Sequence, residues 1–96
     1  MILHLVSFKY KADVDADTQR QHRERLSALR SIDGIVDLKV GADVVRSPRS
    51  YDTGLAVTFV DRAALDAYQK HDRHVPVAQH GASLCDHIVA VDFETE

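Results

Sequence analysis

The sequence predicts an α+β fold with the element order strand, helix, strand, strand, helix, strand. Four segments alternate apolar and polar residues with the two-residue period of a strand. The stretches after the first and the third of them instead repeat apolar residues every three or four positions, as helices do. The 96 residues leave no room for two independent cores, so residues 1–96 are expected to form a single domain.

The expected strands cover residues 2–10, 35–45, 53–60 and 86–93. In the first strand, His4 shares a face with Val6 and Phe8, whereas Leu3 and Leu5 share the other face. The inner face of the second strand is expected to carry Val36, Leu38 and Val40, and that of the third Thr53, Leu55, Val57 and Phe59.

The first expected helix opens at the aspartates 13, 15 and 17, whose carboxylates can cap free N–H groups. Its buried stripe contains His22 and Leu26, and Gly34 supplies the left-handed residue that usually follows a helix. Asp61 is expected to cap a short helix, and residues 71–84 a second one with Pro76 in its first turn. Four antiparallel strands with the helices on one face form a ferredoxin-like arrangement, which is the natural solution for this order.

The expected sheet has two apolar faces, although a sheet covered by helices on one side normally shows water a polar opposite face. The side chains that point away from the helices are Leu3, Leu5, Ala56, Val60, Val89, Val91 and Phe93. Burying seven such side chains contributes on the order of 10 kcal/mol. The sequence therefore predicts a homodimer in which two such faces pack together.

Composition excludes several classes of partner. The net charge of −3 argues against a nucleic-acid partner, because phosphate binding needs a concentrated basic face. Cys85 is the only cysteine, so no intrachain disulfide can form, and no signal peptide or membrane span is evident. The sequence thus predicts a cytoplasmic protein without a membrane or nucleic-acid partner.

The residues best suited to chemistry are several histidines and one tyrosine. His4 lies on the helix-facing side of the first strand, while Tyr68, His71 and His74 follow each other at three-residue spacing and can line one side of a cavity. His22 can enter from the first helix. A buried imidazole exchanges protons near neutral pH, and a phenol beside it can donate to a carbonyl or an enolate. Such a pocket suits proton abstraction next to a carbonyl, aldol-type ring closure or a lyase step.

A metal site is the competing use of the same histidines. His71 and His74 could bind a metal together, with His4 as a third ligand. Because no acidic or cysteine ligand follows at a suitable spacing, the acid–base use is favoured, and neither a metal nor another cofactor is expected.

Several segments, taken together and in order, resemble the stress-responsive dimeric α/β-barrel family, called Dabb. They are His4–Lys9, Tyr51 leading into Ala56–Phe59, Ala64–His71 with His74 three residues on, and Val91–Phe93. The resemblance covers essentially the whole chain and implies a ferredoxin-like fold whose two sheets pack into a barrel-like dimer. Known activities in the family include a plant polyketide cyclase and a plant hydroxynitrile lyase, both with a pocket between sheet and helices.

The resemblance also implies which residues act. An essential histidine of the cyclase matches His74, its first-strand histidine matches His4, and its helix tyrosine matches Tyr68. A third histidine of the cyclase falls on Thr53 here, and a tyrosine that lines its pocket from the first helix falls on Arg25.

The leading hypothesis is a homodimeric enzyme that acts on a carbonyl or polyketide-like compound. His74 would be the general base, Tyr68 would polarise the carbonyl, and His4 would assist by hydrogen bonding. The residues expected to contact the substrate are His22, Arg25, Leu26, Val36, Leu38, Thr53, Leu55, His71 and Ile88. The alternative is a non-catalytic stress-response or ligand-binding dimer.

Overall fold

Strands and helices follow each other in the predicted order in the computed structural model, which describes residues 1–96. The elements are β1 (Ile2–Tyr10), α1 (Ala16–Ser27), a 3-10 turn (Ala28–Ser31), β2 (Ile35–Ala42), β3 (Thr53–Phe59), α2 (Arg62–Gln69), α3 (His74–Leu84) and β4 (Cys85–Glu94). None of the helices has the length and hydrophobicity that a membrane crossing requires.

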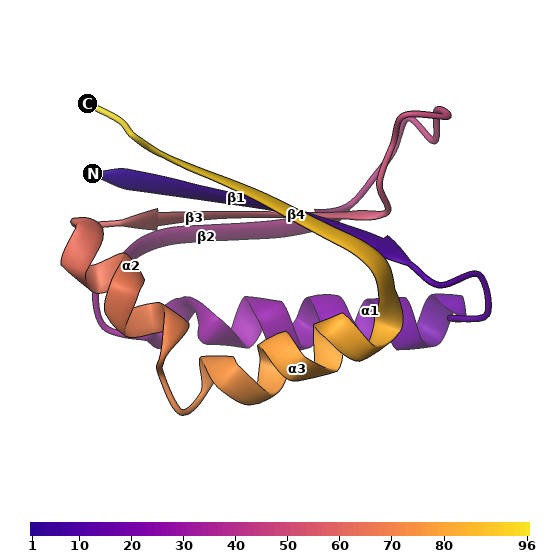
Figure 1. The fold of residues 1–96 in the computed structure, drawn as a ribbon, viewed down its shortest axis with the longest axis horizontal. Coiled ribbons are helices and arrows are strands. Elements are labelled where there is room, and N and C mark those ends of the chain that lie inside the picture. Colours follow the sequence, from indigo (N-terminus) through magenta and orange to yellow (C-terminus); the bar gives the residue numbers. More distant parts are fainter.

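The strands form one antiparallel sheet in the order β2-β3-β1-β4, and all three helices cover the same face of it (Figure 1). The predicted ferredoxin-like α+β fold is thus confirmed. The sheet and the helices enclose the core, in which Phe59 and Tyr68 are among the most deeply buried side chains. Because β1 lies between β3 and β4, its residue His4 has Val57 and Asp92 as neighbours in the ladder.

Alternation along β1 and β3 decides which side chains face the helices. In β1 every even-numbered residue from Ile2 to Tyr10 is buried, and in β3 every odd-numbered residue from Thr53 to Phe59 is buried. Strand β2 departs from this regularity, because its register with β3 shifts between Ile35 and Asp37.

The prediction that Val36 shares the inner face of β2 is therefore wrong. The irregularity leaves Val36 50% exposed, whereas Leu38, two residues on, is buried as predicted. The strand also ends at Ala42 rather than at residue 45, and Val44 and Val45 lie exposed in the following loop.

Capping side chains fix where α1 and α2 begin, as the sequence predicts. Asp15 accepts a hydrogen bond from the Thr18 N–H, and Asp61 accepts one from the Ala64 N–H, each over 2.8 Å. Gly34 has a φ of 90°, and a Cβ at this position would lie only 2.6 Å from the Cβ of Ala64. Only glycine fits this turn, which packs the start of β2 against α2.

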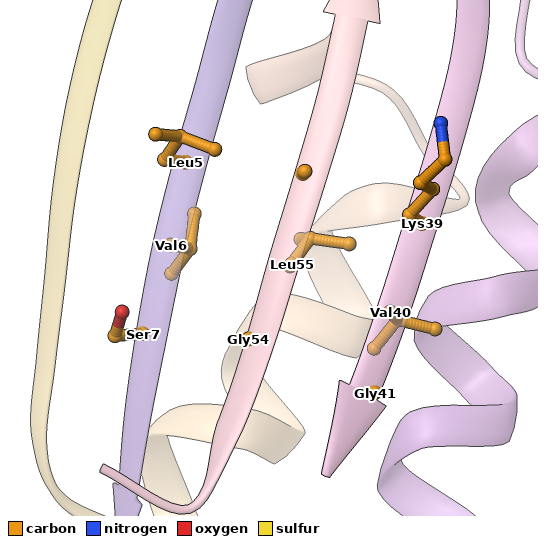
Figure 2. A pocket seen from close by; sticks show the side chains of 9 residues that line it. Leu5, Val6, Ser7, Lys39, Val40, Gly41, Gly54 and Leu55 are labelled. Carbon is orange, nitrogen blue, oxygen red and sulfur yellow. The ribbon is translucent and has the colours of Figure 1, made fainter. Parts of the chain in front are cut away.

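The face of the sheet away from the helices is apolar and hollowed. Val89, Val91 and Phe93 of β4 are 50%, 56% and 45% exposed there. Gly41 and Gly54 are paired in the ladder, and the space above them forms a hollow of about 480 Å³ across β1, β3 and β2 (Figure 2). The β2–β3 loop rises from the sheet on this same side (Figure 1).

Candidate functional site

A cavity of about 210 Å³ lies between the sheet and the helices. Nine of its twelve lining residues are hydrophobic. The lining consists of His4, Val6 and Phe8 from β1, Leu26 from α1, Leu55 from β3, Tyr68 and Gln69 from α2, His74, Val77 and Ala78 from α3, and Ile88 and Ala90 from β4. Three polar rings thus meet in a mostly apolar space, which is the usual character of a small-molecule site.

Tyr68 and His74 stack at one wall of this cavity. Tyr68 lies on the buried side of α2, and His74 is the first residue of α3, so the short connection between the two helices brings the rings together. Their centroids are 4.1 Å apart, and the ring planes are inclined by 35°. The Tyr68 hydroxyl and the His74 Nδ1 atom are buried, and neither has a hydrogen-bond partner.

Burial keeps both groups uncharged at neutral pH. It raises the pKa of Tyr68 to about 12, because a phenolate would lose its hydration in this place. Burial is also the largest cause that lowers the pKa of His74 below its ordinary value of 6.5. The Gln69 backbone carbonyl favours the protonated ring and partly opposes this shift. Charge repulsion from the nearby His4 and His71 lowers the pKa further. The site therefore pairs a protonated phenol with a neutral imidazole.

His4 completes the polar group from the side of the sheet. Its ring is 6.1 Å from that of Tyr68 in an edge-on arrangement, and the residue is only 5% exposed. The His4 Nδ1 atom forms a short contact with Oδ1 of Asp92, which lies opposite it on β4. An ionised carboxylate accepts the Nδ1 proton and leaves Nε2 as the basic nitrogen.

Asp92 is a residue that the sequence reasoning missed. The outward positions of Val91 and Phe93 imply that Asp92 points inward, and its side chain is 39% exposed at the edge of the sheet. An acidic residue at an inward position of a strand was the available signal, but its partner His4 is 88 positions away in the chain.

The structure brings some of the other predicted residues to the cavity and leaves the rest outside. Leu26, Leu55 and Ile88 line it together with His4, Tyr68 and His74. The residues that do not line it are His22, Arg25, Val36, Leu38, Thr53 and His71. Leu38 belongs to the core, Val36 is displaced by the irregularity in β2, and the His71 Nδ1 atom accepts the Arg73 N–H over 3.0 Å.

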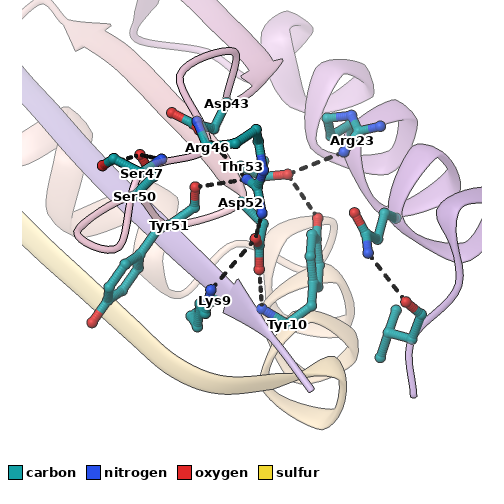
Figure 3. Close-up of polar contacts among 12 residues, drawn as sticks. Lys9, Tyr10, Arg23, Asp43, Arg46, Ser47, Ser50, Tyr51, Asp52 and Thr53 are labelled. Carbon is teal, nitrogen blue, oxygen red and sulfur yellow. Dashed lines mark hydrogen bonds and ion pairs between the residues drawn. The ribbon is translucent and has the colours of Figure 1, made fainter. Parts of the chain in front are cut away.

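His22 and Thr53 belong to a second buried polar network, centred on the Tyr10 hydroxyl. This hydroxyl lies 2.7 Å from His22 Nδ1. It also lies 2.9 Å from Thr53 Oγ1, to which Arg23 donates over 3.2 Å (Figure 3). The ring of Phe8, which lines the cavity, packs edge-on against His22 at 4.9 Å. A stripe on α1 correctly indicates that His22 is buried, but it cannot indicate that the residue lies behind Phe8.

Burial of His22 is complete, and its Nε2 atom lacks a hydrogen-bond partner. Loss of hydration is the largest cause that lowers its pKa to about 4, and the charges of His80, Arg25 and Arg23 act in the same direction. A Cβ on Gly81 would approach Nε2 to 2.9 Å, so the close packing of α3 against α1 depends on this glycine.

Asp52 anchors the β2–β3 loop beside this network. Its carboxylate accepts the Tyr10 N–H over 2.8 Å and Nη2 of Arg46 over 2.7 Å (Figure 3). Although burial is the largest influence and acts to raise it, the pKa of Asp52 is lowered by these hydrogen bonds and by Lys9. Arg46 has a φ of 54°, a conformation that its bonds to the loop hold in place.

The histidines do not gather as metal ligands. No group of three His, Cys, Asp or Glu side chains lies close enough together to hold a metal ion. His71 bonds to the backbone outside the cavity, so the arrangement of His4, His71 and His74 as three ligands does not occur.

Family membership follows from the sequence of residues 2–95, which matches the model of the stress responsive A/B barrel domain, Dabb. The chain belongs to this family. No curated protein matches the sequence of this Dabb domain.

Solved structures share the fold over nearly the whole chain. A protein of Thermobifida fusca is 26% identical with a TM-score of 0.90, and the match covers 98% of this Dabb domain and 90% of that chain. A protein of a Jannaschia species is 27% identical with a TM-score of 0.82, and the match covers 98% of both chains. Both are described as dimeric ferredoxin-like proteins of unknown function.

A hydroxynitrile lyase from Passiflora edulis is 18% identical with a TM-score of 0.85, and the match covers 96% of this Dabb domain and 90% of that chain. At this identity the likeness concerns the fold alone.

We predict that the burial of His22 makes the fold sensitive to acid, because burial disfavours the protonated imidazole. Because the pKa is about 4 in the folded state and 6.5 in the unfolded state, the unfolded chain binds the extra proton between these values. The stabilisation is complete above pH 6.5 and is lost as the pH falls toward 4. Urea unfolding of the wild type at pH 7.5 and pH 5 should show a loss of about 2 kcal/mol from this residue.

The variant His22→Gln removes the titration, so its free energy of unfolding should fall less over the same pH interval. The exposed His87 gives the matched control, and His87→Gln should retain the wild-type pH dependence. Equal losses in the wild type and in His22→Gln would contradict the prediction.

Proposed function

We propose that this Dabb domain is a homodimeric enzyme that makes or breaks a carbon–carbon bond next to a carbonyl group, by acid–base chemistry without an organic cofactor. The observation that carries the proposal is the Tyr68–His74 pair, in which two buried polar atoms without partners belong to rings that line one cavity. A buried unsatisfied polar atom costs about 1–3 kcal/mol, and a bound carbonyl compound would supply the missing partners.

His74 would act as the general base. Its lowered pKa keeps the imidazole neutral near pH 7, so that a lone pair is available to take a proton from the substrate. Tyr68 would donate its proton in a hydrogen bond to the carbonyl or developing enolate oxygen, which its pKa of about 12 allows at neutral pH. The short distance between the rings lets both groups act on one small molecule.

His4 and Asp92 would support this pair. The Asp92 carboxylate holds the His4 ring by its Nδ1 atom and favours the form of the ring with a basic Nε2. His4 lines the cavity from the opposite wall and can accept a second hydrogen bond from the substrate there. Asp92 is a positioning residue in this scheme, because it acts through His4.

The cavity favours a small substrate. Its volume of about 210 Å³ lies below the roughly 300–1,000 Å³ of sites for drug-sized ligands, so a single ring or a short chain fits better than an extended polyketide. With a cyanohydrin, His74 would take the hydroxyl proton, the C–O bond would become a carbonyl, and the bond to the nitrile carbon would break. The departing cyanide would then recover the proton from the imidazolium. With a ketone, the base would take a proton from carbon, and the enolate would attack a second carbonyl. The alkoxide formed there would take the proton back from the imidazolium.

The Passiflora edulis lyase supports this proposal in one respect: it shows that a protein of the same fold carries out a reaction of this class.

The outer face of the sheet would form the dimer interface. Two solved structures with the same fold are described as dimeric, and this face exposes Val89, Val91 and Phe93 next to the half-buried Leu3 and Leu5. Packing two such faces together removes apolar surface from water without covering the cavity, which lies on the helix side.

We predict that His74→Gln lowers kcat/KM for cleavage of benzaldehyde cyanohydrin by about 10²- to 10⁴-fold, because the base is lost. Tyr68→Phe should lower it by about 10²- to 10³-fold. The measurement is the absorbance of the benzaldehyde released, and a β-hydroxyketone tested in the same way covers the aldol reaction. In the wild type, kcat/KM should fall as the pH drops through a value below 6.5, where His74 becomes protonated.

The matched control is His71→Gln, because this histidine lies three residues from His74 but does not line the cavity. It should keep wild-type activity. Turnover of both substrates that His74→Gln leaves unchanged, or no turnover by the wild type, would contradict the catalytic proposal.

Association through the outer face is tested by Val91→Asp, which places a charge at the centre of the exposed apolar side chains of β4. We predict that the wild type sediments as a dimer at 10 µM and that Val91→Asp sediments as a monomer. Val75→Asp is the control, because Val75 is 37% exposed on α3, on the other side of the molecule. It should remain dimeric, and a wild type that is monomeric would contradict the proposed interface.

A further inference from the structure

A shallow groove between α1 and α3 combines two arginines with an apolar floor. Its volume is about 240 Å³, and it is lined by Arg25, Ala28, Leu29, Arg73 and Val77. Leu29 and Val77 are buried, whereas both arginines are exposed at the rim. The groove is therefore apolar at its base and positively charged where it opens.

Neither guanidinium group in the groove has a carboxylate partner. Ion pairs with aspartate or glutamate neutralise Arg20, Arg46 and Arg62, but no such pair reaches Arg25 or Arg73. The positive charge at this place also contrasts with the net charge of −3 of the whole chain. Two uncompensated cations beside one groove favour an anionic occupant.

One of the two arginines is held in position without being neutralised. Nη2 of Arg73 donates a hydrogen bond to the backbone carbonyl of Ala28 over 2.8 Å. This bond links the start of α3 to the end of α1 and uses one of the five N–H groups of the guanidinium. The remaining donors stay free, and the cost of ordering this long side chain for a ligand is already met.

We propose that this groove binds the carboxylate of a small organic acid. The carboxylate would lie between Arg25 and Arg73, because a planar guanidinium matches its two oxygens in a paired hydrogen bond. The apolar part of the acid would lie on Leu29 and Val77, which gives an organic acid an advantage over an inorganic anion.

The groove is distinct from the cavity but adjoins it. Val77 lines both, so its side chain forms the wall between them, and none of the groove's other four lining residues lines the cavity. The groove lies among the helices and therefore stays open in the proposed dimer. Binding of an acid there does not require the proposed chemistry at His74.

The test is a titration of the ¹⁵N-labelled full chain with hexanoate, followed by the shifts of its amide signals, with hexanamide as the uncharged probe of the same shape. Hexanoate should shift the signals of the groove residues in a saturable way and bind at least tenfold more tightly than hexanamide. Arg25→Gln should weaken hexanoate binding about tenfold, and Arg73→Lys should weaken it as well, because it keeps the charge but loses the planar fork.

Arg20→Gln is the matched control, because Arg20 lies on α1 outside the groove and is already paired with Asp17 and Glu24. It should leave the affinity unchanged. Equal affinity for hexanoate and hexanamide, or an equal loss in Arg20→Gln, would overturn the proposal. Inorganic phosphate that displaces hexanoate at the same concentration would overturn its assignment to an organic acid.

Discussion

Strand β1 lies in the interior of the sheet and fixes which side chains of its two neighbours face the helices. Because side chains alternate along a strand, a slip of one residue would exchange every inward and outward position. In the observed register, His4 points to the cavity with Asp92 beside it, while Leu3 and Leu5 point to the opposite face with Val91 and Phe93. The candidate site and the candidate dimer surface therefore depend on the same pairing.

Loss of hydration sets the character of the cavity. The same physical cause raises the pKa of Tyr68 and lowers that of His74, since in each case burial disfavours the charged form. An uncharged donor and an uncharged base thus lie together near neutral pH. Two residues of opposite charge in the same place would instead form an ion pair with each other. The Tyr68 hydroxyl and the His74 Nδ1 atom have no hydrogen-bond partner in the protein and remain available to a ligand.

Much of the fold can be predicted from local patterns. Alternation predicts the buried faces of β1 and β3, and the carboxylates of Asp15 and Asp61 predict the helix starts. His4 lies on the helix-facing side of β1, Tyr68 on the buried side of α2, and His74 at the start of α3. These elements pack against each other in this fold, so the sequence also predicts that the three side chains line one cavity.

Local patterns in the sequence do not show how far a buried side chain lies from the cavity, nor in which register two strands pair. The stripe on α1 shows that His22 is buried, yet only the packing of Phe8 decides that it lies outside the cavity. The contact of His4 with Asp92 depends on the pairing of the first strand with the last. The exposure of Val36 depends on a shift in the register of β2 with β3, between Ile35 and Asp37. Each of these is a relation between distant segments, which a period in one segment cannot encode.

The proposed chemistry requires a neutral His74 imidazole beside a protonated Tyr68 phenol in the cavity. The most direct measurement is an NMR titration of the imidazole signals in the ¹³C,¹⁵N-histidine-labelled chain, assigned with the variant His74→Gln. We predict that His74 titrates below pH 6.5 and is neutral at pH 7. A His74 that titrates at or above pH 6.5 would contradict it.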